Sequence, residues 1–193
     1  MIIKETRSGG IEEKQPGVYD AICVGLIDVG TKQDKFTEKD KHQVLIQFEL
    51  LDQFYTDSNG EEQRSTHSQF YTLSVHEKSN LRKALRGWRG RDFTADELAG
   101  FELKNILSKP CKLVITHNEN GKAIIDNVLK FEGEVEQPKE VRYFSFDDFN
   151  GHFPSWMSEG MIGMLKDCNE YINYSENNEA PKVNELEEEE IPF

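Results

Sequence analysis

The sequence contains no apolar run that approaches the roughly 20 residues a membrane-spanning helix requires. Its first residues, Met1-Ile2-Ile3-Lys4-Glu5-Thr6, also lack the basic start and the long apolar stretch of a signal peptide. Both absences favour a cytoplasmic protein without membrane attachment.

Cysteine and apolar residues are scarce as well. The three cysteines, Cys23, Cys111 and Cys168, are odd in number and far apart, which argues against a disulfide framework and favours buried thiols in a reducing compartment. Hydrophobic residues make up only 36% of the 193 residues, a low share for a chain that is packed throughout. We therefore expect one domain of ordinary size with appendages that are not packed.

The usual patterns of catalysis and metal binding are missing. The five histidines are scattered, and Cys111 and His117 lie about 20 Å apart along one predicted strand, too far for a single metal ion. The segment 86–91 lacks the Gly-Lys-Ser/Thr ending of a phosphate loop. We predict a non-enzymatic protein without a metal or another cofactor. A nuclease is the alternative, because acids distant in sequence can meet in a fold.

Charge is abundant and unevenly distributed. The net charge is −13, and residues 176–193 contribute −6 of it through seven Glu and one Lys. The segment 78–91 contains no acid at all. Its bases are Lys78, Arg82, Lys83, Arg86, Arg89 and Arg91. A strongly basic segment inside an acidic chain indicates a local role in binding an anion.

Three strand patterns precede this basic segment. Residues 18–29 are rich in β-branched and aromatic side chains, and Gly25 suits a bulge. Residues 43–53 alternate between apolar and polar side chains. The hairpin signal Asp57-Ser58-Asn59-Gly60 then leads into a third strand over roughly 63–75.

Helical signals and two further strands follow. Ser74-Val75-His76-Glu77 reads as a capping box that opens a helix, and Thr94-Ala95-Asp96-Glu97 reads as a second one. The first helix places Leu81, Ala84, Leu85 and Trp88 on one apolar stripe. Two strands, 112–117 and 122–131, flank a turn at Asn120-Gly121.

The order of three strands, a helical segment and two strands predicts a mainly β fold. It is the order of a five-stranded Greek-key barrel of the OB type, with the helical segment between strands three and four. We expect a flexible N-terminal arm over 1–15 and the barrel over 16–131. A C-terminal extension over 132–174 holds a linker, an aromatic segment and a helix over 155–171, and a disordered acidic tail covers 175–193.

Cations and exposed aromatic side chains on such a barrel favour binding to a single strand of DNA, which offers phosphates and unstacked base faces. The predicted DNA-binding residues are Lys32, Lys35, Phe36, Lys41, Tyr55, Arg64, Phe70, Arg82, Lys83, Arg86, Arg89 and Arg91. Trp88 and Tyr71 fall on apolar faces and are predicted to lie in the core. The plainer alternative is that the basic segment is an ordinary solvated helix face.

The acidic tail ends on apolar residues, which add nothing to solubility. The predicted partner-binding residues are Glu187, Glu188, Glu189, Glu190, Ile191, Pro192 and Phe193. A terminal Phe preceded by acids suits a small apolar pocket ringed by Arg or Lys. The alternative is that the acids only keep the protein soluble.

This tail closely resembles that of bacterial single-stranded DNA-binding proteins. The body resembles a phage or prophage single-stranded DNA-binding family, and the resemblance covers most of 16–131. Its segments are Gly17-Val18-Tyr19, 27–31, 46–50, 73–83 and 88–91. The resemblance implies an OB-fold that protects single-stranded DNA in phage replication or recombination inside a bacterial host cell. It also implies that the tail recruits replication and recombination proteins.

A second hypothesis belongs to a different class. In it, the barrel is an adaptor that binds a protein of a phage replisome or recombinase, and the tail recruits a further component. The sequence leaves the oligomeric state open.

Overall fold

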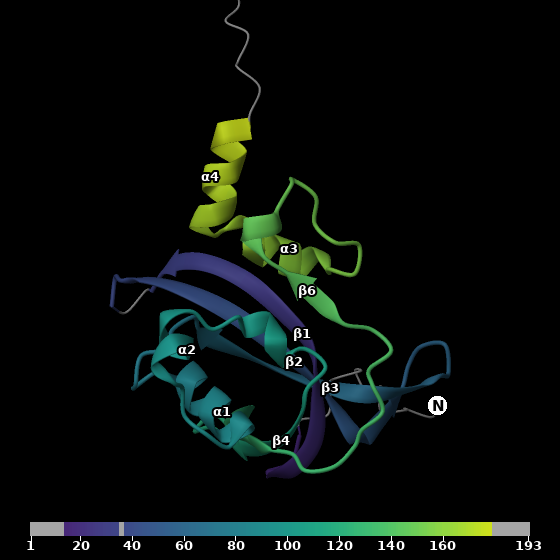
Figure 1. The fold of residues 1–193 in the computed structure, drawn as a ribbon. Coiled ribbons are helices and arrows are strands. Elements are labelled where there is room, and N and C mark those ends of the chain that lie inside the picture. The colour runs from purple at the N-terminus through teal and green to yellow at the C-terminus, as the bar shows by residue number, and fades with distance from the viewer. Residues whose placement is uncertain (1–13, 35–36, 179–193) are drawn as a thin grey trace, which may run out of the picture.

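The computed structural model describes residues 14–34 and 37–178, and it is mainly β. The five long strands are β1 (Gly17–Gln33), β2 (Asp40–Thr56), β3 (Glu62–Thr72), β4 (Pro110–His117) and β5 (Ala123–Lys130). They form one antiparallel sheet in the order β3-β2-β1-β4-β5, and a short strand, β6 (Arg142–Phe144), pairs in parallel with β1 (Figure 1).

Helices occupy two places in the chain. Between β3 and β4 lie α1 (Asn80–Arg89), α2 (Ala95–Ala99) and the 3-10 turn η1 (Leu103–Ile106). After β6 come η2 (Phe146–Asp148), α3 (Glu159–Lys166) and α4 (Asn169–Asn178). The two groups lie at opposite ends of the molecule, with α1 at one end and α4 at the other (Figure 1). The predicted order of three strands, a helical segment and two strands is the order observed.

The sheet is open where a barrel would close. Strands β3 and β5 stand at the two ends of the sheet, and no backbone pairing joins them in the described part of the chain. One side chain spans the seam. The Gln69 amide donates from Nε2 to the Ile125 carbonyl oxygen at 3.0 Å, and its Oε1 accepts from the Ile125 N–H at 2.7 Å. The coarse fold was predicted, but the closed barrel is not what the strand pairing shows.

The main core lies between the inner face of the sheet and α1. The alternation in 43–53 correctly places Val44, Ile46, Phe48 and Leu50 in this core. The Trp88 ring lies 5.5 Å from that of Phe48, and its indole nitrogen donates to the Pro110 carbonyl oxygen at 2.7 Å. Tyr71 is 4% exposed. The core assignments of Trp88 and Tyr71 are therefore confirmed.

The predicted bulge and the buried thiols are also present. The register between β1 and β2 shifts between Cys23 and Gly25. All three cysteines are buried, and burial raises the pKa of the Cys23 thiol to about 12. These thiols stay protonated and act as small apolar side chains.

Helix α1 begins later than the sequence predicted. Ser79 is the N-cap and accepts from the Arg82 N–H, whereas Ser74 was predicted to cap the helix. The Ser74 hydroxyl oxygen instead accepts from the His76 N–H in a local turn, and the Ser79 hydroxyl donates to the Ser74 carbonyl oxygen. Serine side chains form such turns as readily as they cap helices. The predicted capping box at Thr94 and Glu97 is confirmed.

The C-terminal extension contains two helices, where one was predicted over 155–171. The chain breaks after Lys166, because Cys168 is buried against β1 at Gly30. Helix α4 then continues to Asn178, so residues 175–178, assigned to the tail, are helical. Residues 1–13, 35–36 and 179–193, which include most of the predicted arm and tail, lie outside the described part of the chain.

This extension packs on the outer face of β1 and β2. A second buried cluster joins Ile27 and Leu45 of the sheet to Phe144, Met157 and Leu165 of the extension. Aromatic rings surround that cluster and contact one another edge to face. Part of the outer face of the sheet is therefore covered by the chain itself.

Glu170 anchors α4 to β1. Its carboxylate accepts from the Thr31 N–H and the Thr31 hydroxyl, both at 2.6 Å, and one oxygen lies 3.6 Å from His42 Nδ1. Partial burial raises the pKa of Glu170, but the Thr31 hydrogen bonds outweigh burial and the pKa falls below its ordinary value of 4.5. The ionised carboxylate is therefore the form that holds the extension.

We expect this anchor to weaken in acid. Because the folded pKa is lowered, the contribution of Glu170 is present above the unfolded pKa and is lost as the pH falls through the folded value. The difference in unfolding free energy between the wild type and Glu170→Gln should shrink as the pH is lowered through 4.5 toward the lowered pKa of the folded state. Urea titrations at several pH values measure it, and a difference independent of pH would contradict the assignment.

Gly87 sets the distance between α1 and β5. A Cβ atom at this position would overlap the Val128 carbonyl oxygen, whereas a Cβ at Gly163 in α3 would meet nothing within 4 Å. Gly→Ala in a helix normally stabilises by roughly 0.4–1 kcal/mol. We expect Gly163→Ala to show that gain and Gly87→Ala to destabilise, because α1 must move away from the core. Thermal unfolding of both variants tests this, and equal gains would show that α1 shifts freely.

Candidate nucleic-acid interface

The predicted DNA-binding lysines and arginine of the strands form hydrogen bonds and ion pairs with other residues of the protein. The Lys32 ammonium donates to the Met164 carbonyl oxygen at 2.5 Å, near the end of α3. Lys41 pairs with Asp34 at 2.5 Å, and the Arg64 guanidinium pairs with Glu49 at 3.0 Å and with Glu136 at 3.3 Å. Lys35 and Phe36 lie outside the described residues, so their roles stay predictions.

Three of the five predicted cations between Arg82 and Arg91 also have carboxylate partners. Arg82 pairs with Asp92 at 3.2 Å, and both Arg89 and Arg91 pair with Glu97. The Arg89 guanidinium also lies 4.7 Å from the centre of the Phe93 ring. The hydrogen bond from Arg91 is the main cause that lowers the pKa of Glu97 to about 2, so this carboxylate stays ionised. The acids that follow the basic segment thus neutralise much of it.

Lys83 and Arg86 are the exceptions. Both are exposed on α1, and neither forms an ion pair with a described residue. The Lys83 ammonium donates a hydrogen bond to the backbone carbonyl oxygen of Asp126 at 3.5 Å. Because this acceptor is neutral, it does not compensate the charge of Lys83. These two side chains, on one exposed face of α1, are free to contact phosphates.

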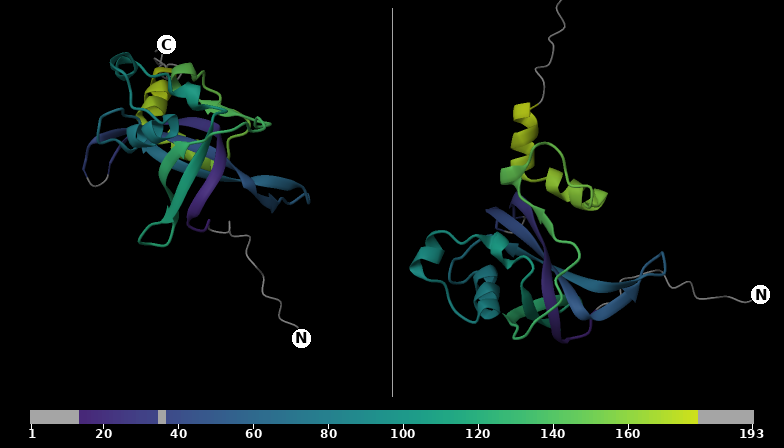
Figure 2. Two further views of the ribbon diagram at one scale, coloured as in Figure 1. Left: turned by 60° about the horizontal axis from the view of Figure 1, so that its bottom comes forward. Right: turned by 45° about the vertical axis from the view of Figure 1, so that its right-hand side comes forward.

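The two described aromatic candidates are exposed but lie in different places. Phe70 is 47% exposed on the outer face of β3, opposite Leu45 of β2. Tyr55 is 53% exposed near the end of β2, in the hairpin with β3 that projects beyond the rest of the sheet (Figure 2). Phe70 lines a hollow that also reaches Lys78, just before α1, whereas Tyr55 does not line it.

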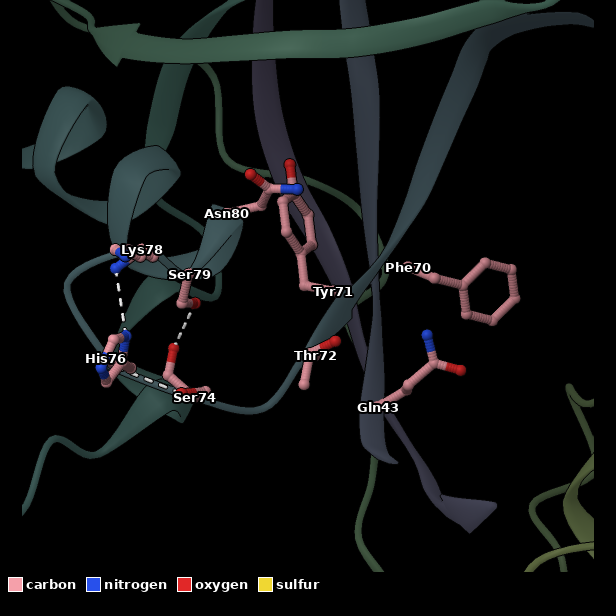
Figure 3. A pocket seen from close by; sticks show the side chains of 9 residues that line it. All are labelled: Gln43, Phe70, Tyr71, Thr72, Ser74, His76, Lys78, Ser79 and Asn80. Carbon is pink, nitrogen blue, oxygen red and sulfur yellow. Dashed lines mark hydrogen bonds between the residues drawn. The ribbon is translucent and has the colours of Figure 1, made fainter. Parts of the chain in front are cut away.

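An open hollow of about 470 Å³ connects the free edge of β3 to the start of α1. Gln43 and Phe70 lie on the sheet side, Tyr71 turns toward Asn80, and Lys78 and His76 lie on the far side (Figure 3). The hollow is shaped by the turn before α1, in which Ser74, His76 and Ser79 bond to one another (Figure 3).

A second hollow continues from the first along α1. The two hollows share Lys78, Ser79 and Asn80 in their walls, and the second extends to Arg82, Lys83 and Arg86. Glu77 and Asp92 also line it, so its cations outnumber its acids by four to two. Together they form a path, here called the α1 path, from an exposed aromatic ring across polar side chains to free cations.

The α1 path includes residues that the sequence-based site did not. Lys78 belongs to the basic segment but was not among the predicted contacts, and no pattern in the sequence singles out Gln43, His76 and Asn80. Conversely, Tyr55, Arg64 and Lys41 do not line it. The cations of the sequence therefore predicted the basic side of α1. The polar walls could not be predicted in this way, because they depend on how β2 and β3 meet the helix.

Two further observations concern other classes of site. Across residues 14–34 and 37–178, no group of three or more His, Cys, Asp or Glu side chains is arranged to hold a metal ion. Within the same ranges, no helix combines the length and the apolar composition that crossing a bilayer requires.

Comparison with protein-family models, with curated proteins and with solved structures finds no match to this chain. The function must therefore be argued from the chemistry of the α1 path itself.

Proposed function

We propose that this protein is a non-enzymatic binder of single-stranded DNA that tolerates many sequences and protects the strand during phage replication or recombination. A sequence-tolerant binder needs an aromatic platform for bases and cations for the backbone, and the α1 path offers Phe70 together with Lys78, Lys83 and Arg86. That pairing in one continuous surface is the observation that carries the proposal.

We also propose that the sheet is an open form of the OB barrel. The strand order β3-β2-β1-β4-β5, with α1 between β3 and β4, supports this, and so does the Gln69 bridge where β3 would meet β5. In OB-folds the face of strands two and three and the adjoining loops bind oligonucleotides. Phe70 lies on that face, on the part that the C-terminal extension leaves exposed.

The acidic total charge does not oppose this function. Screening limits the reach of exposed charges to about 8 Å at physiological ionic strength, so phosphates on α1 respond mainly to the cations beside them and little to the net charge of the whole chain. The tail forms the second part of the proposal, in which residues 187–193 recruit replication or recombination proteins. These residues lie outside the described part of the chain.

Titration with oligo-dT at two salt concentrations tests the function. Binding measured by the fluorescence anisotropy of labelled oligo-dT, weaker at higher salt, would support it. A folded protein that ignores oligo-dT at low salt would overturn it and favour the adaptor, in which the same exposed surface binds a protein.

Replacing the free cations should lower the salt dependence of binding. Each lost phosphate contact reduces the slope of log affinity against log salt by about 0.7 for a single strand, so Lys83→Ala with Arg86→Ala should reduce it by about 1.4. The matched control is Arg91→Ala. The Arg91 guanidinium is paired with Glu97, so its removal should change the slope little. Fluorescence titrations across a salt series measure the slope for the double variant and for the control. Equal changes in the two slopes would show that the DNA backbone does not lie along Lys83 and Arg86.

Removing the aromatic platform should weaken binding without unfolding the protein. Loss of one stacked base costs roughly 1–3 kcal/mol, so Phe70→Ala should lower affinity by that amount. Tyr55→Ala removes a similarly exposed ring from the projecting hairpin and serves as the control. Comparison of the affinities of Phe70→Ala and Tyr55→Ala for oligo-dT shows which ring stacks on the bases. A larger loss for Tyr55→Ala would move the stacking site to the hairpin.

A further inference from the structure

A separate hollow of about 430 Å³ opens beside the C-terminal half of α1, and we call it the Trp88 pocket. Its floor is apolar and is formed by Leu85, Trp88, Phe101, Ile106 and Phe131, which come from α1, from the segment around η1 and from the residue after β5. The pocket shares no residue with the two hollows of the α1 path. It is therefore a second surface feature, distinct from the proposed DNA site.

The rim of the Trp88 pocket is basic. Arg89, Arg91 and Lys109 line it together with a single acid, Glu97, so that cations exceed acids by two in a protein whose net charge is −13. Glu97 pairs with both arginines, whereas Lys109 is exposed and forms no ion pair with a described residue. An apolar floor beneath a cationic rim selects a ligand that carries an apolar or aromatic group with carboxylates beside it.

The end of the β2–β3 hairpin has this complementary composition. Residues 51–63 contain no base and four acids. The acids are Asp52, Asp57, Glu61 and Glu62. Two aromatic side chains lie among them, Phe54 with 51% and Tyr55 with 53% of its surface exposed. Aromatic side chains are enriched where proteins contact one another, so these rings and acids together resemble the ligand that the pocket selects.

The hairpin is rigid and projects from the sheet. Where β2 runs through 49–54, β3 runs only through 64–66, and this bulge directs the hairpin away from the rest of the strands (Figure 2). One carboxylate oxygen of Asp57 fixes the turn by accepting from the N–H groups of Asn59 and Glu61, both at 2.9 Å. An arm that is ordered before it binds loses little conformational entropy on binding.

We propose that the Trp88 pocket receives the β2–β3 hairpin of a second copy of this chain. An aromatic ring of the hairpin lies over the apolar floor, and the hairpin acids lie beside the cations of the rim. The hairpin cannot reach the pocket of its own copy, because strand pairing holds it on the side of the molecule opposite α1 in every view (Figures 1 and 2). The α1 path is less suitable as the receptor, because its cationic hollow, from Lys78 to Arg86, has no apolar side chain in its walls.

This contact joins two different surfaces. A bound copy still offers a free hairpin on one side and a free pocket on the other, so association runs head to tail and continues unless the rotation between copies closes a ring. Neither surface belongs to the α1 path. The association is therefore independent of the proposed DNA binding and is measured in the absence of DNA.

Charge reversal on each surface of the full chain tests the proposal. Glu61→Lys with Glu62→Lys reverses the hairpin, and Lys109→Glu reverses the rim. None of these side chains forms an ion pair with a described residue, so the fold should not change. By sedimentation equilibrium, each variant alone should associate about tenfold more weakly than the wild type. An equal mixture of the two, or all three changes in one chain, should restore association, because opposite charges then face each other again.

Two controls and a local probe accompany these variants. Glu119→Lys and Lys122→Glu reverse exposed charges in the turn between β4 and β5 and should leave association unchanged. In a Trp156→Phe background Trp88 is the only tryptophan. Its emission should shift as the protein concentration rises and hairpins enter the pockets.

The other outcomes overturn the proposal. A wild type that stays monomeric at all concentrations would exclude a second copy as the occupant, and so would a mixture that fails to recover association. Association that Lys109→Glu leaves unchanged would place the hairpin on another surface. An equal loss in the two controls would show that net charge alone governs association. Emission from Trp88 that does not vary with concentration would show that nothing enters the pocket.

Discussion

Strand β1 is buried on both of its faces along its middle, and the sheet and the C-terminal extension are built around it. Its inner face forms the core with α1, and its outer face holds the aromatic cluster of the C-terminal extension. It pairs along its length with β2, β4 and β6. Two register shifts bend the strand, so that its far end reaches α4 while its near end reaches β4. A strand that is apolar on both sides needs cover on both sides, and this requirement places the extension on the outer face.

Much of the fold could be predicted from local patterns. Alternation in 43–53 assigned the core face of β2, the signals at 57–60 and Asn120-Gly121 marked hairpins, and the apolar stripe put Trp88 in the core. Two of the failures share a cause, which is that contacts distant in sequence override local signals. The helix predicted over 155–171 breaks because Cys168 packs against Gly30, and the seam between β3 and β5 depends on one side chain, Gln69.

The candidate site was harder to predict, because charge in a sequence does not show which charges remain free. Asp92 and Glu97 follow the basic segment directly, yet only the fold reveals that they fold back onto Arg82, Arg89 and Arg91. What remains is a smaller basic surface at Lys78, Lys83 and Arg86. The polar and aromatic walls beside it come from β2 and β3. No pattern within 78–91 could predict that these strands lie next to the basic surface.

The Gln69 bridge gives the sheet a hinge line. Two hydrogen bonds to Ile125 hold β3 beside β5, and breaking both costs roughly 1–3 kcal/mol in hydrogen bonding, a small fraction of what a continuous ladder would resist. Phe70 directly follows Gln69 in β3, so the exposed ring stands next to the residue that bridges the seam. The edge of the sheet that offers an aromatic ring to solvent is therefore also the edge that is held to β5 by a side chain, with no backbone ladder in the described part of the chain.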